Sequence, residues 1–233
     1  MGSKQLRGGR TTPDVRRIGH IVKRTANGNS VFVHELLRFL ERMEFEGSPT
    51  SLGFDQSGHH LLTFIPGNVP HRRHAFSDEA VIKAAELLRR LHDATARCKL
   101  KASDEVVIHG DPGPHNMVFR EGVPVALIDW DAAKPGRRLQ DISDAVWGFT
   151  NLACDGQHPR KHVRHIRLFC SAYGGADPIA AVLLIEQDVR SALAKHTAAG
   201  RLTPASVFVP LVRWFDTYRT ELLELVTASH DIH

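Results

Sequence analysis

Two short segments in the middle of the chain constrain its fold and chemistry more than any other feature. The first segment starts with Val107-Ile108, continues as His109-Gly110-Asp111 and reaches Asn116 through a stretch rich in proline and glycine. The second is the apolar run Val125 to Ile128, which reads as a strand and ends at Asp129. Carboxylate and amide oxygens are the ligands that Mg²⁺ prefers. These residues could therefore hold Mg²⁺ beside a free carboxylate, a set of groups that phosphoryl transfer would need because it depends on positioning and charge neutralisation.

These segments resemble the aminoglycoside phosphotransferase and choline kinase family, which shares the protein-kinase fold. That family writes its loop as His-Gly-Asp followed by four residues and Asn, and its metal strand as Ile-Asp-Trp/Phe-Asp. Here Asp111 and Asn116 are separated by the same spacing, and Ile128-Asp129-Trp130-Asp131 matches the strand. The similarity covers about residues 8 to 195. Weaker family markers within it are Leu87 to Ala94, Phe64-Ile65-Pro66-Gly67 and Ala172-Tyr173-Gly174.

The resemblance implies a role for each residue of the two segments. Asp111 is the expected general base, which orients the acceptor hydroxyl and accepts its proton. Asn116 and Asp129 are the expected ligands of Mg²⁺, which bridges the phosphates of the donor nucleotide, ATP or GTP. Asp131 is either a further ligand or a helix cap. His109 matches a buried scaffold residue of the loop.

The resemblance also implies nucleotide-binding residues in the N-terminal third. The family holds the α- and β-phosphates with a strand lysine that is paired with a helix glutamate. Lys23 and Arg24 both occur at the end of the expected strand, on opposite faces, so only one can reach the phosphates. We expect Lys23 to do so, with Glu35 as its partner, although Glu35 lies late in the helix relative to the family pattern. Phe64 and Ile65 are expected to meet the base through backbone groups.

Two further features extend this interpretation. Asp141 resembles the family aspartate that begins the next helix and supports the loop backbone by hydrogen bonds. Gly8-Gly9-Arg10 is the candidate for a glycine-bearing turn over the phosphates, or else part of a flexible tail.

The resemblance implies an α+β, bilobal, protein-kinase-like fold, and hydrophobic periodicity and turn residues predict the elements of its two lobes. A small β-rich N-lobe (residues 1–66) should contain one helix, capped by Ser30, and strands at 15–18, 21–24, 50–54 and 60–65. Pro66-Gly67 marks the boundary. The larger, mostly helical C-lobe (67–233) should contain the two segments above and these helices: 77–95, 140–151, 159–173, 178–198 and 206–228.

Composition limits the cellular setting and the partners. The 233 residues are 42% hydrophobic and 24% charged, without an apolar run of the length that crosses a membrane, and three widely spaced cysteines suit a reducing compartment. We therefore expect a cytoplasmic protein, monomeric or dimeric, that does not bind a membrane. The net charge is +4, yet the basic residues form only short pairs without nucleic-acid-binding motifs, so nucleic acid is not an expected partner.

The expected partners are thus a nucleotide and a small-molecule acceptor. Acids and bases are about equal in number after Asp141, so no acidic pocket for a polycation is evident, and the acceptor should be neutral, zwitterionic or weakly cationic. His158, His162 and His165 have a spacing that could bind zinc, but their basic neighbours favour a solvated helix face. The alternative function is a regulatory, nucleotide-binding pseudokinase. A protein kinase is disfavoured because no Ala-Pro-Glu segment follows Asp129.

Overall fold

The N-terminal part of the protein is an antiparallel sheet with one helix. The computed structural model describes residues 3–5, 15–70, 75–154 and 156–228. Five strands pair in the order β1-β2-β3-β5-β4. Their bounds, with that of helix α1, are β1 Ser3–Gln5, β2 Val15–Ile18, β3 Ile21–Thr25, α1 Ser30–Arg42, β4 Ser51–Phe54 and β5 His59–Thr63. Apolar residues at helical spacing form the buried face of α1: Val33, Leu36, Leu37 and Leu40.

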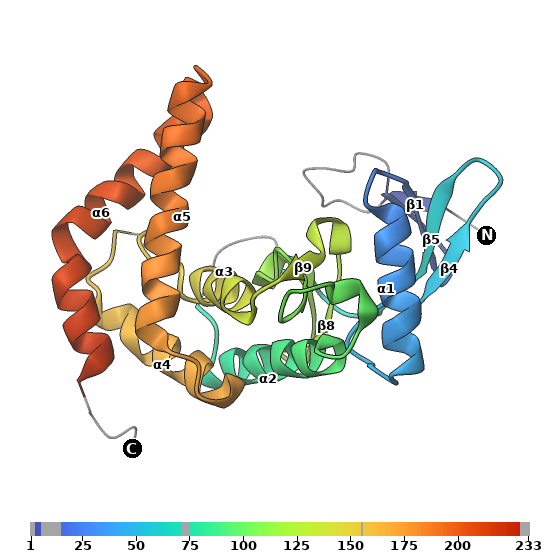
Figure 1. Cartoon of the computed structure of the whole chain (residues 1–233), viewed down its shortest axis with the longest axis horizontal. Coiled ribbons are helices and arrows are strands. Elements are labelled where there is room, and N and C mark those ends of the chain that lie inside the picture. The colour runs from blue at the N-terminus through green and yellow to red at the C-terminus, as the bar shows by residue number, and fades with distance from the viewer. Residues whose placement is uncertain (1–2, 6–14, 71–74, 155, 229–233) are drawn as a thin grey trace.

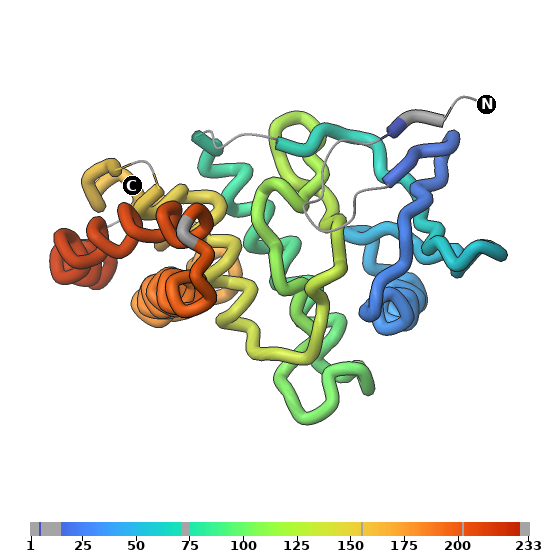
Figure 2. The backbone as a smooth tube through the Cα atoms, turned by 90° about the horizontal axis from the view of Figure 1, so that it is seen from above, coloured from blue at the N-terminus to red at the C-terminus, as the bar shows by residue number. Residues whose placement is uncertain are grey.

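The remainder of the chain is mostly helical. The second helix, α2, packs against α3 and α4 and against two short strands, β6 (Val106–Ile108) and β8 (Val123–Leu127), and α5 packs against α6. The helices are α2 Asp78–Thr95, α3 Arg138–Thr150, α4 Arg160–Gly174, α5 Pro178–Ala198 and α6 Leu202–Thr227. Figure 1 shows the sheet and α1 at one end of the molecule and α5 and α6 at the other, and Figure 2 shows the same order from above. One continuous cluster of buried apolar side chains extends from Val33 to Val226.

Two small antiparallel ribbons lie between the sheet and the helices, and they carry the segments of interest. One ribbon pairs β6 (Val106–Ile108) with β9 (Lys134–Gly136), and the other pairs β7 (Met117–Arg120) with β8 (Val123–Leu127). Backbone hydrogen bonds tie the β7–β8 ribbon to earlier parts of the chain: Leu127 N donates to Gly47 O at 2.8 Å, and Asn68 N donates to Phe119 O at 2.9 Å.

The expected α+β architecture is confirmed, with several local corrections. Asn29 rather than Ser30 precedes the first helical residue of α1, and the helix ends at Arg42 because Glu44 adopts a left-handed conformation with φ 55°. Strand β8 ends at Leu127, two residues before Asp129. Strands β1 and β9 were not predicted, because β1 is only three residues long and β9 contains a proline.

The cysteines and the lengths of the helices bear on the expected cellular setting. The three cysteines are free thiols. No single helix in the described part is both long and apolar enough to cross a membrane, whereas α4 and α5 meet that criterion only as a pair bent by 116°.

Candidate active site

The loop after β6 is held tightly against the turn after β8. Gly110 has a φ of +83°, and a Cβ atom there would lie 2.3 Å from the carbonyl oxygen of Ala132, so only glycine fits this close approach. A short 3-10 turn, Pro114–Asn116, completes the loop, and a second one, Trp130–Ala132, follows Asp129. Ile128 N also donates to Asn116 O at 2.9 Å. These contacts bring Asp111, Asn116 and Asp129 to one place.

Asp111 is an accessible carboxylate with two side-chain partners. Its side chain is 53% exposed and lies 3.2 Å from His115 Nε2. Asn116 Nδ2 donates to Asp111 Oδ2 and to its backbone oxygen, both at 3.0 Å. Partial burial raises the pKa of Asp111, but hydrogen bonding and charge from His115 outweigh it, and the net pKa is below its usual range. Asp111 is therefore ionised at neutral pH and can accept a proton from a hydroxyl group.

Asn116 and Asp129 offer the oxygens that a magnesium site needs. Because the amide nitrogen of Asn116 is engaged by Asp111, its Oδ1 is the atom left to face a cation. Asp129 has left-handed backbone angles, φ 60° and ψ 63°, which for a residue other than glycine are uncommon and are found where a functional side chain must be aimed. Mg²⁺ is commonly held by one or two protein oxygens together with water and nucleotide phosphates. The two residues fit such an ion.

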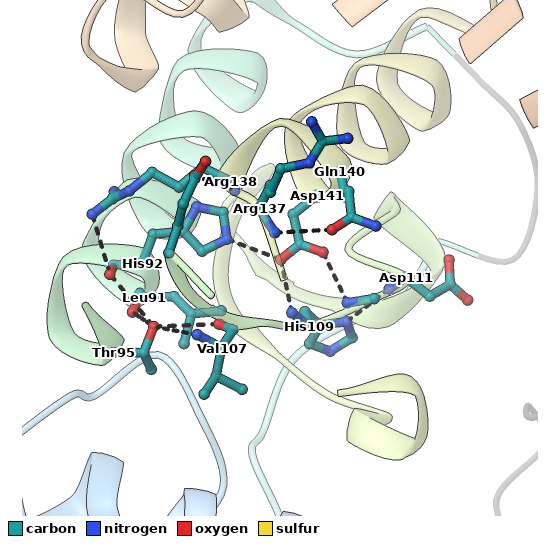
Figure 3. A network of polar contacts seen from close by, with 12 residues as sticks. Leu91, His92, Thr95, Val107, His109, Asp111, Arg137, Arg138, Gln140 and Asp141 are labelled. Atoms are coloured by element: carbon teal, nitrogen blue, oxygen red, sulfur yellow. Dashed lines mark hydrogen bonds and ion pairs between the residues drawn. The ribbon is translucent and has the colours of Figure 1, made fainter. Parts of the chain in front are cut away.

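A buried polar network supports the loop from below. Asp141 is fully buried and accepts hydrogen bonds from His109 N at 2.7 Å and Gly110 N at 2.8 Å (Figure 3). Its Oδ2 lies 3.0 Å from His92 Nε2, and His92 Nδ1 lies 2.7 Å from the Tyr173 hydroxyl. Asp141 thus has the supporting position expected from the sequence, fixing the backbone directly before Asp111.

His109 is a scaffold residue in this geometry. Its Nδ1 accepts from Asp111 N at 3.4 Å and its Nε2 donates to Ile128 O at 3.0 Å, which is the pattern of a neutral ring. Burial lowers the pKa of His109, which is consistent with that neutral form. The ring also packs 4.7 Å from the ring of Trp130. His109 therefore connects the loop to the Asp129 segment without facing the site.

The structure places Arg24, and not Lys23, beside the turn that carries Asp129. Arg24 is buried, and its guanidinium contacts both Asp129, with Nη1 3.4 Å from Oδ1, and Asp131. Lys23 points to the other face of the strand, where Nζ lies 2.6 Å from Asp55 Oδ2. The alternation of the strand was correctly anticipated, but the face that meets the site carries Arg24. The expected pair between Lys23 and Glu35 is absent, because Glu35 is exposed on α1 and makes no ion pair with another described residue.

This geometry predicts unequal effects of removing the two charges. Arg24→Met should weaken nucleotide binding strongly, since a charge-assisted contact of this kind contributes about 1.5 to 3 kcal/mol. Lys23→Met, the matched control on the opposite face, should change nucleotide affinity by less than about twofold, because its partly exposed ion pair with Asp55 lies away from Asp129. Titration of each variant with ADP measures both effects. Equal losses in the two variants would contradict the assignment.

In the segment after β5, Phe64-Ile65, one backbone group is not free to contact a nucleotide base. Phe64 N donates to His20 O at 2.7 Å, so this backbone donor is already used and a bound base would need other groups of the segment. The Phe64 ring lies 3.7 Å from the guanidinium carbon of Arg17, and Ile65 is half-buried. Contacts of Phe64 and Ile65 with a base remain a prediction. Gly8-Gly9-Arg10 lies outside the described residues.

Acidic residues gather beside Asp111, which the sequence did not reveal. Asp141, Asp144 and Gly148 are spaced to share one face of α3, and a Cβ at Gly148 would lie 2.7 Å from Pro114 of the loop, so this face is turned to the loop. Burial, together with the charges of Asp141, Asp188 and Asp111, raises the pKa of Asp144 to about 7. The balance of acids and bases in the sequence after Asp141 did not reveal the nearness of these carboxyl groups to Asp111. Many bases of this half are engaged elsewhere; Arg164, for example, pairs with Asp78 and Arg190 with Glu186.

Asp144→Asn should stabilise the protein, and more so at high pH. The pKa of Asp144 is about 7 in the folded protein, above the unfolded value of about 3.9. Between these values the folded state binds more protons than the unfolded state, so wild-type stability falls as pH rises through this range. The variant lacks this loss, and its stability gain should be larger at pH 8 than at pH 5 by on the order of 1 to 2 kcal/mol. Unfolding by urea at the two pH values measures it, and an equal gain at both would contradict the shifted pKa.

The histidines of α4 and its preceding turn have separate partners. His162 is buried with Nδ1 2.9 Å from Thr150 O, His165 lies 3.1 Å from Asp78, and His158 lies 3.4 Å from Glu221. No cluster of three or more potential metal-ligating side chains occurs among the described residues. The expected solvated face is thus only partly correct, since His162 belongs to the interior.

Comparisons with known proteins agree with this geometry. Solved structures with the same fold include the gentamicin complex of aminoglycoside phosphotransferase APH(2")-IIa, which has a TM-score of 0.62, 15% identity and 91% coverage of both chains. Another is a choline/ethanolamine kinase family protein from Mesorhizobium loti, with a TM-score of 0.60, 16% identity and coverage of 98% of this chain and 93% of the other. These structures confirm the expected kinase-like fold.

Sequence comparisons are more specific. The trifolitoxin immunity protein of Rhizobium leguminosarum bv. trifolii is 36% identical over 190 residues, covering 72% of each chain. The model of the phosphotransferase enzyme family matches residues 19–179, a range that includes Arg24, the loop, Asp129 and Asp141. The chain therefore belongs to the phosphotransferase enzyme family.

Proposed function

We propose that this protein transfers the γ-phosphoryl group of ATP or GTP to a hydroxyl group of a small molecule, with Mg²⁺. The observation that carries the proposal is the convergence of Asp111, Asn116 and Asp129 at one place on two tightly joined turns. Their chemistry supplies a proton acceptor and two metal-binding oxygens, which is the set that phosphoryl transfer needs. Structures of family relatives with bound ADP and GDP support a nucleotide as the donor.

Each residue of the site has a defined part in this reaction. Asp111, ionised and half-exposed, orients the acceptor hydroxyl and takes its proton as the oxygen attacks phosphorus. Asn116 and Asp129 would hold magnesium, which when bound neutralises charge on the phosphates. Arg24 reaches the same place from β3 and adds a fixed positive charge for the phosphates. Asp141 keeps the loop backbone in position.

The acceptor is proposed as an antibiotic or a metabolite that carries few positive charges. Asp144 and Asp111 place acidic groups on the acceptor side of the loop, so a single ammonium group is compatible with the site. A polycation would need several clustered carboxylates, and Glu186 is already paired with Arg190 and Arg219. The name of the trifolitoxin immunity protein places trifolitoxin among the compounds to test.

An acceptor screen tests the proposal directly. Purified protein is incubated with Mg²⁺ and ATP or GTP, and nucleotide consumption is recorded with trifolitoxin, choline, ethanolamine, homoserine, neutral sugars and kanamycin. Transfer to one acceptor, with mass spectrometry showing an added phosphoryl group, is the expected result. Kanamycin should be a poor substrate. Asp111→Asn is the control for contaminating kinases.

A regulatory pseudokinase is the second candidate, and one observation favours it. The pair between a strand lysine and a helix glutamate is absent, since Lys23 contacts Asp55 and Glu35 is exposed. Binding of nucleotide without consumption, with any acceptor of the screen, would support this alternative against the proposed transfer.

A further inference from the structure

Arg24 has an unusual pair of partners for a phosphate-binding residue of a strand. Its side chain is only 8% exposed, and its two terminal nitrogens reach different aspartates. Nη1 lies 3.4 Å from Asp129, the expected metal ligand, and Nη2 makes a close ion pair with Asp131. The contact with Asp131 is the tighter of the two. A buried guanidinium needs such a partner, because an unpaired buried charge is strongly destabilising.

The backbone conformation between Asp129 and Asp131 places their side chains against different nitrogens of Arg24. Asp129 has left-handed angles, and the residues after it form the 3-10 turn Trp130–Ala132. Trp130 is buried between them, with its Nε1 donating to Leu127 O at 3.1 Å. Its ring anchors the turn, so the positions of Asp129 and Asp131 are fixed relative to one another. Asp131 is itself mostly buried, with a side chain 15% exposed, whereas that of Asp129 is 28% exposed.

Asn29, also from the N-terminal part, binds the same Trp130–Ala132 turn through hydrogen bonds. Asn29 precedes α1 and follows β3 closely, and its Nδ2 donates to Asp131 O at 2.9 Å and to Ala133 O at 2.8 Å. Arg24 and Asn29 therefore bind the turn from the strand and from the start of the helix. Both contacts cross between the N-terminal part and the segment that carries Asp129.

On the described strands, neither cross-strand neighbour of Arg24 is an acid, since Val15 lies opposite on β2 and His60 on β5. His60 lies 2.7 Å from Ser51 Oγ through Nε2. Burial, followed by the charge of Arg24, lowers the pKa of His60 to about 4, so this ring is neutral. Helix α1 presents His34 to the same serine at 2.7 Å, while Glu35 faces solvent.

We propose that Asp131 is a positioning residue that holds Arg24 for the nucleotide phosphates, in place of a helix glutamate. The inference rests on the proposed function, because it gives Arg24 the phosphates of the donor as its ligand. It divides the two aspartates of the turn into one that serves the metal and one that serves the arginine. It also removes the observation that favoured a pseudokinase, because the ion pair between Arg24 on the strand and Asp131 on the turn replaces the absent pair between a strand lysine and a helix glutamate. Asn29 stabilises the same arrangement from the helix end.

The test is a double-mutant cycle on nucleotide affinity, which needs no acceptor. The variants are Arg24→Met, Asp131→Asn and the double variant, titrated with ADP, and with GDP as the second probe, in Mg²⁺ and in EDTA. Asp131→Asn keeps the shape of the side chain and should weaken ADP binding at least about tenfold, as should Arg24→Met. The double variant should bind no more weakly than Arg24→Met alone, because the two residues act as a unit. Asp131→Glu should recover part of the affinity.

Two controls separate the proposal from its alternatives. Asp55→Asn removes the ion pair of Lys23 on the opposite face of β3 and should leave ADP affinity within about twofold. The Mg²⁺ concentration that gives half of the full ADP affinity should be unchanged in Asp131→Asn but raised in Asp129→Asn. Thermal unfolding of each variant reports the cost to stability and should show the same non-additive pair.

Several results would overturn the proposal. Additive losses in the cycle would show that Asp131 does not act through Arg24, and a changed Mg²⁺ requirement in Asp131→Asn would make it a metal ligand. Unfolding of Asp131→Asn together with full ADP affinity in Asp131→Glu and Arg24→Met would make the pair purely structural. If the wild-type protein binds ADP and GDP normally and the variants do too, the inference fails and the proposed function survives. If the wild-type protein binds neither nucleotide, both fail.

Discussion

Asp111→Asn is expected to reduce phosphoryl transfer by about 10²- to 10⁴-fold, the usual contribution of a positioned general base. Asparagine has nearly the same shape and can still accept the hydrogen bond from Asn116, so the loop should keep its geometry. What is lost is the negative charge that makes Asp111 a proton acceptor. Nucleotide affinity should stay within about twofold, because the proposed metal ligands and Arg24 are untouched.

Single-turnover transfer and ADP titration on the same preparation measure the two quantities. His115→Ala is the comparison variant: it removes the side chain that lies 3.2 Å from Asp111 but keeps the Asp111 carboxylate, so its effect should be much smaller than that of Asp111→Asn. Transfer by Asp111→Asn within about tenfold of wild type would remove Asp111 from the role of base.

Asp129→Asn is expected to abolish the part of nucleotide affinity that depends on Mg²⁺, along with turnover. The substitution removes a charged oxygen ligand from the proposed metal site. Asparagine tolerates the left-handed angles at this position nearly as well as aspartate, so the turn should be retained. Without magnesium, ADP affinity should be equal to wild type or slightly higher, because a negative charge beside the phosphates is gone.

ADP titrations of wild type and variant, each with Mg²⁺ and with EDTA, give the four numbers needed. The difference between the two conditions should be large for wild type and small for Asp129→Asn. If magnesium improves ADP binding equally in both proteins, Asp129 is not a ligand of the bridging ion.

The sequence alone was sufficient for the fold class and for the residues of the loop and turn. Histidine, glycine and aspartate in the order 109 to 111, with Asn116 and Asp129 at fixed distances along the chain, form a local pattern. Such a pattern can be recognised in a sequence because local backbone geometry restricts which residue fits each position. Gly110, for example, must be glycine for the loop to approach Ala132. Amphipathic helices α1 and α2 were also readable, since their buried faces repeat with the helical period.

Other parts of the site depend on contacts between distant segments. Strand alternation placed Lys23 and Arg24 on opposite faces, but which face meets Asp129 and Asp131 is decided by how the sheet packs on a turn more than a hundred residues away. Asp144 gave no signal in the sequence, because its pKa is raised by burial and by acids that only the packing of α3 and α5 brings near. Local spacing therefore determined which residues carry the proposed chemistry, and tertiary packing decided which charges meet them. Charge interactions act through space, and a linear sequence does not record distance in space.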